Sequence, residues 1–204
     1  MRVAVLDYGI GNLRSPEKAL QHVGAVAHLC RDAASVGAAD AVVLPGVGNF
    51  GACVEALVAS GLDGVARAAV ENGRPFLGVC VGMQMLYEAS TESPDVPGLG
   101  LLPGTVDLLP AEVKRPQMQW NLLTTRQRSH PMFSGIDDPW VYFVHSYVAP
   151  LSDATIATCD YGGPQTAAVS DGHLWATQFH PEKSGPVGLA VLANFVRWAE
   201  GATS

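Results

Sequence analysis

The chain has 204 residues, 48% of them hydrophobic, which suffices for one substantial core, and we interpret residues 1–204 as a single domain. Its 12 Lys and Arg against 19 Asp and Glu give a net charge of −7, without a basic run of the kind that binds a phosphate backbone. The four scattered cysteines, with no signal peptide and no apolar run long enough to cross a bilayer, indicate a cytoplasmic protein. We therefore expect neither nucleic acid nor a membrane as a partner.

The first half of the sequence alternates apolar strands with helical patterns. An apolar run at 2–7 ends in the turn Tyr8-Gly9-Ile10-Gly11-Asn12, after which apolar residues recur at helical spacing. Further strands are expected at 25–30, 41–44 and 75–79, with helices at 52–59 and up to residue 71. Continuous apolar strands separated by helices are typical of a parallel sheet covered on both faces. We expect an α/β fold with a central, mostly parallel sheet flanked by helices.

The second half differs in composition, because Pro and Gly are frequent between Pro94 and Gly104. Short strand-like pieces follow at 105–109, 140–144, 154–158, 167–170 and 174–178. We expect these pieces to be antiparallel additions to the same sheet. Residues 187–200 carry apolar side chains at helical spacing and predict a closing amphipathic helix.

The segment Gly78-Val79-Cys80-Val81-Gly82 follows a buried strand and opens a helical pattern. This is the layout of a nucleophile elbow, with cysteine in place of serine. A sharp strand-to-helix turn crowds its central residue, so small neighbours suit it, and a helix start favours the thiolate. We interpret Cys80 as a nucleophile. The other cysteines lack this context and are interpreted as packing residues: Cys30, Cys53 and Cys159.

A base for this nucleophile is offered by Gln178-Phe179-His180-Pro181-Glu182, at the end of an apolar strand. Residues i and i+2 of an extended chain project to the same side, so Glu182 is placed to orient the His180 ring. His145, the competitor for the role of base, has no acid two residues away and is interpreted as structural or site-lining. The His and Cys spacings match no zinc pattern.

The turn Pro45-Gly46-Val47-Gly48 ends another strand and lets bare backbone approach a ligand. This suits an oxyanion hole built from N–H groups, although a plain tight turn has the same composition. The N-terminal Gly9-Ile10-Gly11 is a weaker signal for a dinucleotide site, because position 14 is Arg where a third glycine is required.

Three motifs together resemble the class I, or triad, glutamine amidotransferases over nearly the whole chain: Pro-Gly-x-Gly, Gly-x-Cys-x-Gly and His-Pro-Glu. Within this class, the sequence is similar to the glutaminase subunits of imidazole glycerol phosphate synthase. The residues that carry this likeness are the opening Asp7 to Asn12, Met83, Met118 with Trp120 and Asn121, and His180 to Ser184. One departure is Gln117 and Gln119, where the family often has His and Gly.

The resemblance implies the class I fold and a glutaminase that needs neither a metal nor an organic cofactor. Cys80 then attacks the side-chain amide of glutamine, His180 protonates the departing ammonia, and water hydrolyses the thioester with His180 as base and Glu182 orienting it. Two further sets of residues receive roles by the same resemblance. They are Gly46, Val47, Gly48 and Val81 for the oxyanion, and Gln84, Glu88, Ser146 and Tyr147 for binding glutamine.

A glutaminase domain of this size leaves no room for a second, ammonia-consuming domain, so the consumer is expected on another chain. The resemblance identifies it as a (β/α)₈ cyclase of histidine biosynthesis that forms a heterodimer with the glutaminase. The candidate docking residues are Asn12, Trp120, Asn121, Tyr142 and Lys183. Two alternatives stay open: the glutaminase of another ammonia-using synthase, such as the one feeding pyridoxal phosphate synthesis, and a non-catalytic scaffold subunit.

Overall fold

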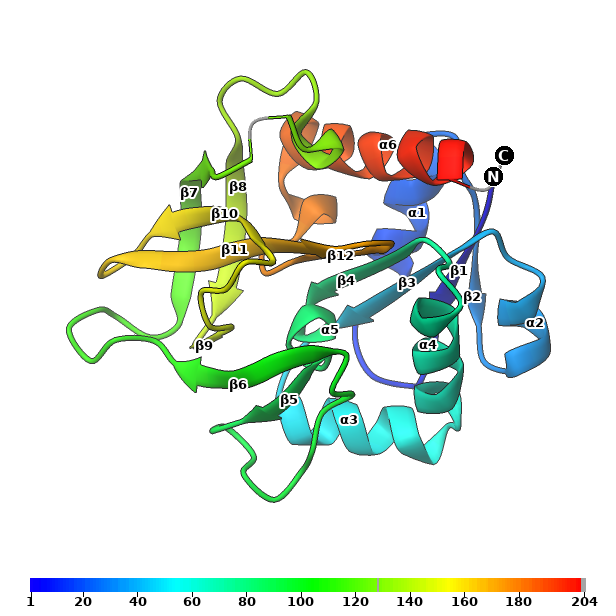
Figure 1. Cartoon of the computed structure of the whole chain (residues 1–204), viewed down its shortest axis with the longest axis horizontal. Helices are drawn as coiled ribbons and strands as arrows, with labels where there is room; N and C mark the ends of the chain where they lie inside the picture. Colours follow the sequence, from blue (N-terminus) through cyan, green and yellow to red (C-terminus); the bar gives the residue numbers. More distant parts are fainter. Residues whose placement is uncertain (128, 203–204) are drawn as a thin grey trace.

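The structure is a computed structural model that describes residues 1–127 and 129–202. Its main feature is a nine-stranded sheet (Figure 1). The parallel part consists, in spatial order, of β2 (Val26–Cys30), β1 (Arg2–Leu6), β3 (Ala41–Gly46), β4 (Phe76–Cys80) and β12 (Leu174–Thr177). The antiparallel part continues with β11 (Pro164–Asp171), β10 (Thr155–Asp160), β7 (Gln117–Thr125) and β8 (Trp140–His145). The expected α/β fold is confirmed.

The central strands β3, β4 and β12 are buried along their entire lengths. This explains their continuous apolar sequences, because both faces of a parallel sheet are covered. Figure 1 shows α1 (Arg14–His22) and α6 (Gly185–Ala202) on one side of these strands, and α3 (Phe50–Ala59) and α4 (Leu62–Glu71) on the other. The short helix α2 (Ala33–Gly37) lies beyond the β2 edge.

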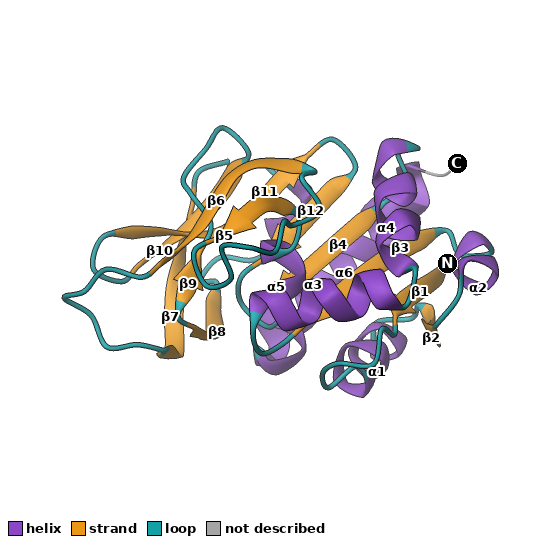
Figure 2. Ribbon diagram, turned by 90° about the horizontal axis from the view of Figure 1, so that it is seen from below, coloured by secondary structure: helices purple, strands orange, loops and turns teal. Residues whose placement is uncertain are grey.

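A smaller sheet consists of β5 (Tyr87–Ser90), β6 (Leu102–Leu108) and β9 (Tyr147–Val148). Figure 2 shows it beside the antiparallel half of the main sheet. In this sheet β5 and β6 run parallel, and β9 pairs antiparallel with β6. The pairing brings Tyr147, just after β8, to Gln84, whose side-chain amide donates to the Tyr147 carbonyl at 2.9 Å.

Two expectations about the strands are corrected. The piece expected at 105–109 pairs in the smaller sheet, as part of β6, and does not extend the main one. The piece expected at 174–178 runs parallel to β4, because a tight turn after β11 reverses the chain and inserts β12 between β11 and β4. Strand β7 was missed because its polar residues alternate with exposed apolar ones, which gives no inward apolar face.

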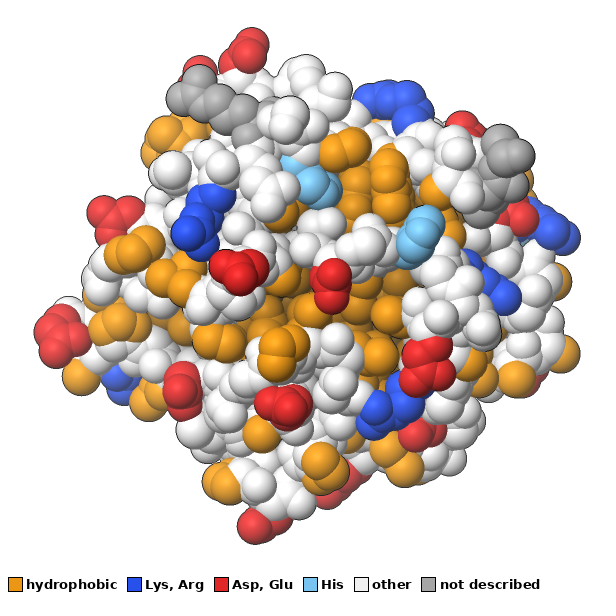
Figure 3. Space-filling view, in the orientation of Figure 1, with side chains coloured by type: hydrophobic (Ala, Val, Ile, Leu, Met, Phe, Trp, Pro, Cys, Tyr) orange, Lys and Arg blue, Asp and Glu red, His pale blue; other side chains and the backbone are white. Residues whose placement is uncertain are grey.

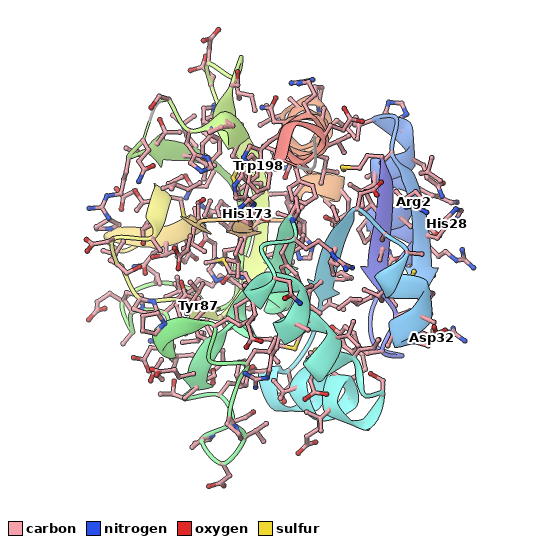
Figure 4. The ribbon with its side chains drawn as sticks, turned by 45° about the vertical axis from the view of Figure 1, so that its right-hand side comes forward. Arg2, His28, Asp32, Tyr87, His173 and Trp198 are labelled. Carbon is pink, nitrogen blue, oxygen red and sulfur yellow. The ribbon has the colours of Figure 1, made fainter. Side chains whose placement is uncertain are left out.

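An aromatic cluster holds α6 against β12. The rings of Trp175 and Trp198 stack with centroids 4.4 Å apart. The ring centroid of His173 lies 6.0 Å from that of Trp198, and Figure 4 shows these two side chains close together. These ring contacts pack the C-terminal part of α6 against β12, the strand that precedes the connection between the two elements. This connection, from Gln178 to Ser184, carries the expected base and its acid.

The surface agrees with the modest negative charge of the sequence. On the face shown in Figure 3, the drawn Lys and Arg side chains are scattered among Asp and Glu. In residues 1–127 and 129–202, no helix combines the length and the apolar character needed to cross a bilayer.

Candidate active site

Cys80 occupies a strained strand-to-helix turn between β4 and the one-turn helix α5 (Val81–Gln84). It is the only non-glycine residue of the described chain with a positive φ, at 56°. A Cβ atom at Gly78 would lie 3.0 Å from a Leu86 methyl carbon, and one at Gly82 would overlap the Leu44 carbonyl oxygen. The elbow geometry is confirmed, and both glycines are required by close packing.

We expect Gly82→Ala to lower the free energy of unfolding by at least about 3 kcal/mol, because the added methyl group meets the backbone of β3. Gly64→Ala is the matched control: it lies within α4 with no neighbouring atom near the added carbon, and we expect a gain of roughly 0.5–1 kcal/mol. Urea unfolding measures both. A Gly82→Ala protein as stable as the wild type would contradict the packing.

The Pro45–Gly48 turn lies directly beside the elbow. Parallel pairing of β3 with β4 sets Gly46 opposite Cys80, and a Cβ at Gly46 would come within 2.6 Å of the Gly82 nitrogen. Val47 and Gly48 continue past the strand, with Gly48 at a φ of +97°. Gly46 therefore brings the turn against the elbow, and the next two residues line the same cavity as Cys80.

Two buried donors hold this turn. The Tyr8 hydroxyl donates to the Pro45 carbonyl at 2.7 Å, and the Cys53 thiol donates to the Val47 carbonyl at 3.3 Å. Burial raises the pKa of Cys53, which keeps it a thiol and hence a donor. The interpretation of Cys53 as a plain packing residue missed this contact, since no local sequence signal connects α3 to the turn.

His180 and Glu182 form a buried pair next to Cys80. The His180 Nδ1 lies 2.8 Å from Glu182 Oε1, with side-chain exposures of 2% and 7%. Burial lowers the pKa of His180, but Cys80 and Glu182 outweigh it and raise the value to about 10. The buried Nε2 has no hydrogen-bond partner among the described residues by distance and angle, yet the interaction with Cys80 contributes most to raising the pKa of the ring. Near neutral pH the ring is thus an imidazolium beside a cysteine.

These residues open into one cavity of about 400 Å³, which we call the Cys80 cavity. Its wall includes the turn and elbow residues Val47, Gly48, Cys80 and Val81, together with His180, Gln84, Ser146 and Tyr147. Thus most of the residues expected for the oxyanion and for glutamine come together here. Gly46 lies behind this wall.

The expectation for Glu88 is corrected. Its carboxylate accepts the Gly104 N–H at 2.8 Å, on the exposed side of β5, and it is not part of the described cavity wall. The acid at the cavity is Glu92, which also accepts the Phe50 N–H at 2.7 Å. Sequence reasoning missed Glu92 because an acid in a Ser- and Gly-rich loop has no periodicity to place it.

His145 lies in the cavity wall, as a structural histidine. Its Nδ1 is 2.8 Å from the Tyr147 carbonyl and its Nε2 is 2.9 Å from the Gln117 side chain. Burial lowers the pKa of His145 to about 4, so the ring is neutral at neutral pH. The prediction of a structural or site-lining role is confirmed.

The expected docking residues separate into three positions. Asn12 and Lys183 lie at the Cys80 cavity, and Trp120 pairs with Tyr142 across β7 and β8, their ring centroids 6.1 Å apart. Asn121 points to the other face of β7, where its amide donates to the Asp160 carbonyl at 2.9 Å. Successive residues of a strand face opposite sides, so Asn121 cannot share a surface with Trp120.

The described residues contain no group of three or more His, Cys, Asp and Glu side chains that could hold a metal ion. What they contain is a cysteine elbow, a His-Glu pair and a glycine-rich turn on an α/β sheet. That fold and that site define a triad-type amidotransferase.

Comparison with known proteins agrees with this assignment to the triad-type amidotransferases. Residues 4–198 match the family model described as glutamine amidotransferase class-I. Imidazole glycerol phosphate synthase subunit HisH from Acinetobacter baylyi is 48% identical over 202 residues, 97% of this chain and 98% of that protein. The HisH subunit of Methanothermobacter thermautotrophicus is 47% identical over 195 residues, 95% of this chain and 97% of its own. The chain belongs to the class-I glutamine amidotransferase family and, within it, to the HisH subunits of imidazole glycerol phosphate synthase.

Solved structures share the fold at low sequence identity. A crystal structure described as a glutamine amidotransferase superposes with a TM-score of 0.74 at 22% identity, covering 98% of each chain. The structure of PurLQS from Thermotoga maritima gives 0.71 at 19% identity, covering 97% of this chain and 98% of that one.

Proposed function

We propose that this chain is the glutaminase of an imidazole glycerol phosphate synthase, and that it passes ammonia to a cyclase subunit in histidine biosynthesis. The observation that carries the proposal is the placement of Cys80, at a strained elbow, beside the buried His180–Glu182 pair and open to the Cys80 cavity. We further propose that residues 1–204 act as one domain, since β12 pairs with both β4 and β11 and so joins the two halves of the main sheet, and that the protein works in the cytoplasm.

The chemistry follows from the positions of the groups. The Cys80 sulfur attacks the side-chain carbonyl carbon of glutamine, and backbone N–H groups of Val47 and Val81 stabilise the oxyanion that forms. The His180 imidazolium gives its proton to the leaving nitrogen, so that ammonia departs and a γ-glutamyl thioester remains. Neutral His180 then takes a proton from water, which attacks the thioester and releases glutamate. Glu182 holds the ring in place throughout.

The substrate is held by the remaining wall of the cavity. Gln84, Ser146 and Tyr147 offer amide, hydroxyl and backbone groups to the α-amino and α-carboxylate groups of glutamine. Glu92 adds a negative charge, which suits the α-ammonium group. The cavity therefore has a polar end for the amino-acid head and the thiol for the amide.

The partner is proposed to dock on the face that β7 and β8 present to solvent. Met118, Trp120 and Leu122 alternate along β7 with exposures of 62%, 49% and 39%, and Trp140 on β8 is 49% exposed. A contiguous exposed face of large apolar side chains is typical of an interface, and Trp is frequent among its strongest contacts. The face adjoins the cavity, since a Cβ atom at Gly185, two residues after Lys183, would lie 3.8 Å from the Trp120 ring.

The glutaminase is expected to be slow alone and fast in the complex. Ammonia escapes to water unless a protected path exists, and the Pro45–Gly48 turn has the glycines needed to reorient an N–H toward the oxyanion. One missing donor costs about 10²–10³ in rate. Glutamate release from the isolated chain, the complex, and the complex with the acceptor nucleotide tests this. Equal rates in all three would refute the switch, and no release in any would refute the glutaminase.

Variants in the docking face test whether the partner stimulates glutamine hydrolysis through this face. We expect Lys183→Ala and Trp120→Ala to form the complex but lose most of the stimulation, since a partner activates only by binding the active arrangement better. Lys18→Ala, an exposed lysine on α1, is the matched control and should keep full stimulation. Full stimulation in Lys183→Ala and Trp120→Ala would place the coupling elsewhere.

A further inference from the structure

Gln178 is a fully buried polar residue that the mechanism above does not use. Its backbone N–H donates to the Ala167 carbonyl at 2.8 Å, which fixes its position at the end of β12. Its side chain turns toward the site, as does that of His180 two residues later. There its Nε2 lies 3.8 Å from the Cys80 sulfur, and its Oε1 lies 3.0 Å from the Gln84 Nε2.

The orientation of both amides follows from a single backbone carbonyl. The Gln84 side chain lies 2.9 Å from the Tyr147 oxygen, which only accepts, so Gln84 must present its NH₂ group there. The second hydrogen of that NH₂ group is donated to Gln178, so the Gln178 side-chain oxygen must face Gln84. The Gln178 NH₂ group is left facing Cys80, and the Gln84 oxygen is left for a donor of the substrate.

The same carbonyl extends the chain of contacts away from the site. The His145 Nδ1 donates to the Tyr147 oxygen, so in the neutral ring Nε2 is an acceptor. The Gln117 Oε1 lies 2.9 Å from the His145 Nε2, and the Gln117 Nε2 lies 3.7 Å from the Cys159 sulfur. Because the oxygen and nitrogen of a side-chain amide can exchange places, an accepting Nε2 is met by the NH₂ group of Gln117, which leaves the amide oxygen for the Cys159 thiol. Gln117, which stands where the family often has His, thus completes a buried series of hydrogen bonds from β7 to the nucleophile.

We propose that Gln178 is a positioning residue of the glutaminase, which donates an N–H to the Cys80 thiolate and holds the Gln84 oxygen toward the substrate. The role rests on the proposed function for its effect on turnover. A thiolate is a stronger acceptor than a thiol, so an N–H aimed at the sulfur favours the charged, attacking form. His180 stabilises the same thiolate by its charge, and Gln178 does so without adding a second titrating group.

The test compares Gln178→Met, which keeps the side-chain length and removes both polar atoms, with Gln178→Asn, which keeps the amide but withdraws it from Cys80. Gln165→Met is the matched control, because its amide only donates to the Tyr161 carbonyl, outside the site. Iodoacetamide labelling of Cys80 in the whole chain is followed against pH by peptide mass spectrometry. We expect the profile of Gln178→Met to move to higher pH, with labelling near neutral pH about tenfold slower, equivalent to about 1.4 kcal/mol.

Gln178→Asn should move the labelling profile in the same direction, and it carries the test if Gln178→Met does not fold. In the complex with the cyclase, both variants should lower kcat, and the KM for glutamine should rise because Gln84 loses its orienting acceptor. Wild-type labelling profiles in folded Gln178→Met and Gln178→Asn would overturn the proposal. Labelling needs neither glutamine nor partner, so a wild-type complex that releases no glutamate would refute the proposed function and leave this result standing.

Discussion

Cys80→Ala is expected to abolish glutamine-dependent synthesis by the complex and to leave ammonia-dependent synthesis by the cyclase partner intact. The variant lacks the atom that forms the thioester, while the backbone of the elbow and the docking face are unchanged. In a comparable catalytic triad, removal of the nucleophile costs about 10⁶ in kcat. Product formation is measured with glutamine and, separately, with an ammonium salt as nitrogen source.

The control for this experiment is Cys30→Ser, which changes a buried thiol outside the Cys80 cavity. We expect its glutamine-dependent rate to stay within a small factor of the wild type, because only packing near β2 is altered. Cys53→Ser keeps a donor for the Val47 carbonyl and should behave in the same way. If glutamine still served the Cys80→Ala complex, the nucleophile would be another residue.

His180→Ala is expected to reduce glutamine turnover nearly as far as Cys80→Ala, and Glu182→Gln to reduce it less. His180 supplies the proton to ammonia and accepts one from water, whereas Glu182 holds the ring through one 2.8 Å contact. Loss of the base in a triad costs about 10⁶ and loss of the orienting acid about 3 × 10⁴. The two rates are compared by single-turnover glutamate release in the presence of the cyclase.

Glu88→Gln is the matched control for Glu182→Gln, since it removes a carboxylate that lies outside the cavity and binds Gly104. Its turnover should be close to that of the wild type, because Glu88 lies outside the Cys80 cavity. Wild-type turnover in Glu182→Gln would remove Glu182 from the triad. If Glu88→Gln lowered glutamine turnover as much as Glu182→Gln, Glu88 would have to take part in binding glutamine.

The sequence by itself determined the features that depend on neighbours along the chain. The strained turn at Cys80 needs Gly78 and Gly82 within two residues, and the His180–Glu182 contact joins residues two apart in the chain. The backbone there is a 3₁₀ turn over Pro181–Lys183 and not the extended segment expected from the sequence. The order of strands and helices in the first half follows from local apolar periodicity in the same way. Such constraints act over a few residues, so they can be predicted from the sequence without knowledge of the fold.

The tertiary structure alone decided which distant segments meet. Parallel pairing of β4 with β12 sets Val79 opposite Thr177, which brings Cys80 to His180 and leaves Gln178 against both Cys80 and Gln84. Strand pairing of this kind depends on long-range packing, and a register shift of one residue reverses every side chain. For the same reason, only the folded chain shows that Glu92 and not Glu88 lies at the cavity. It also shows that the Asn121 side chain points to the face of β7 opposite that of Trp120.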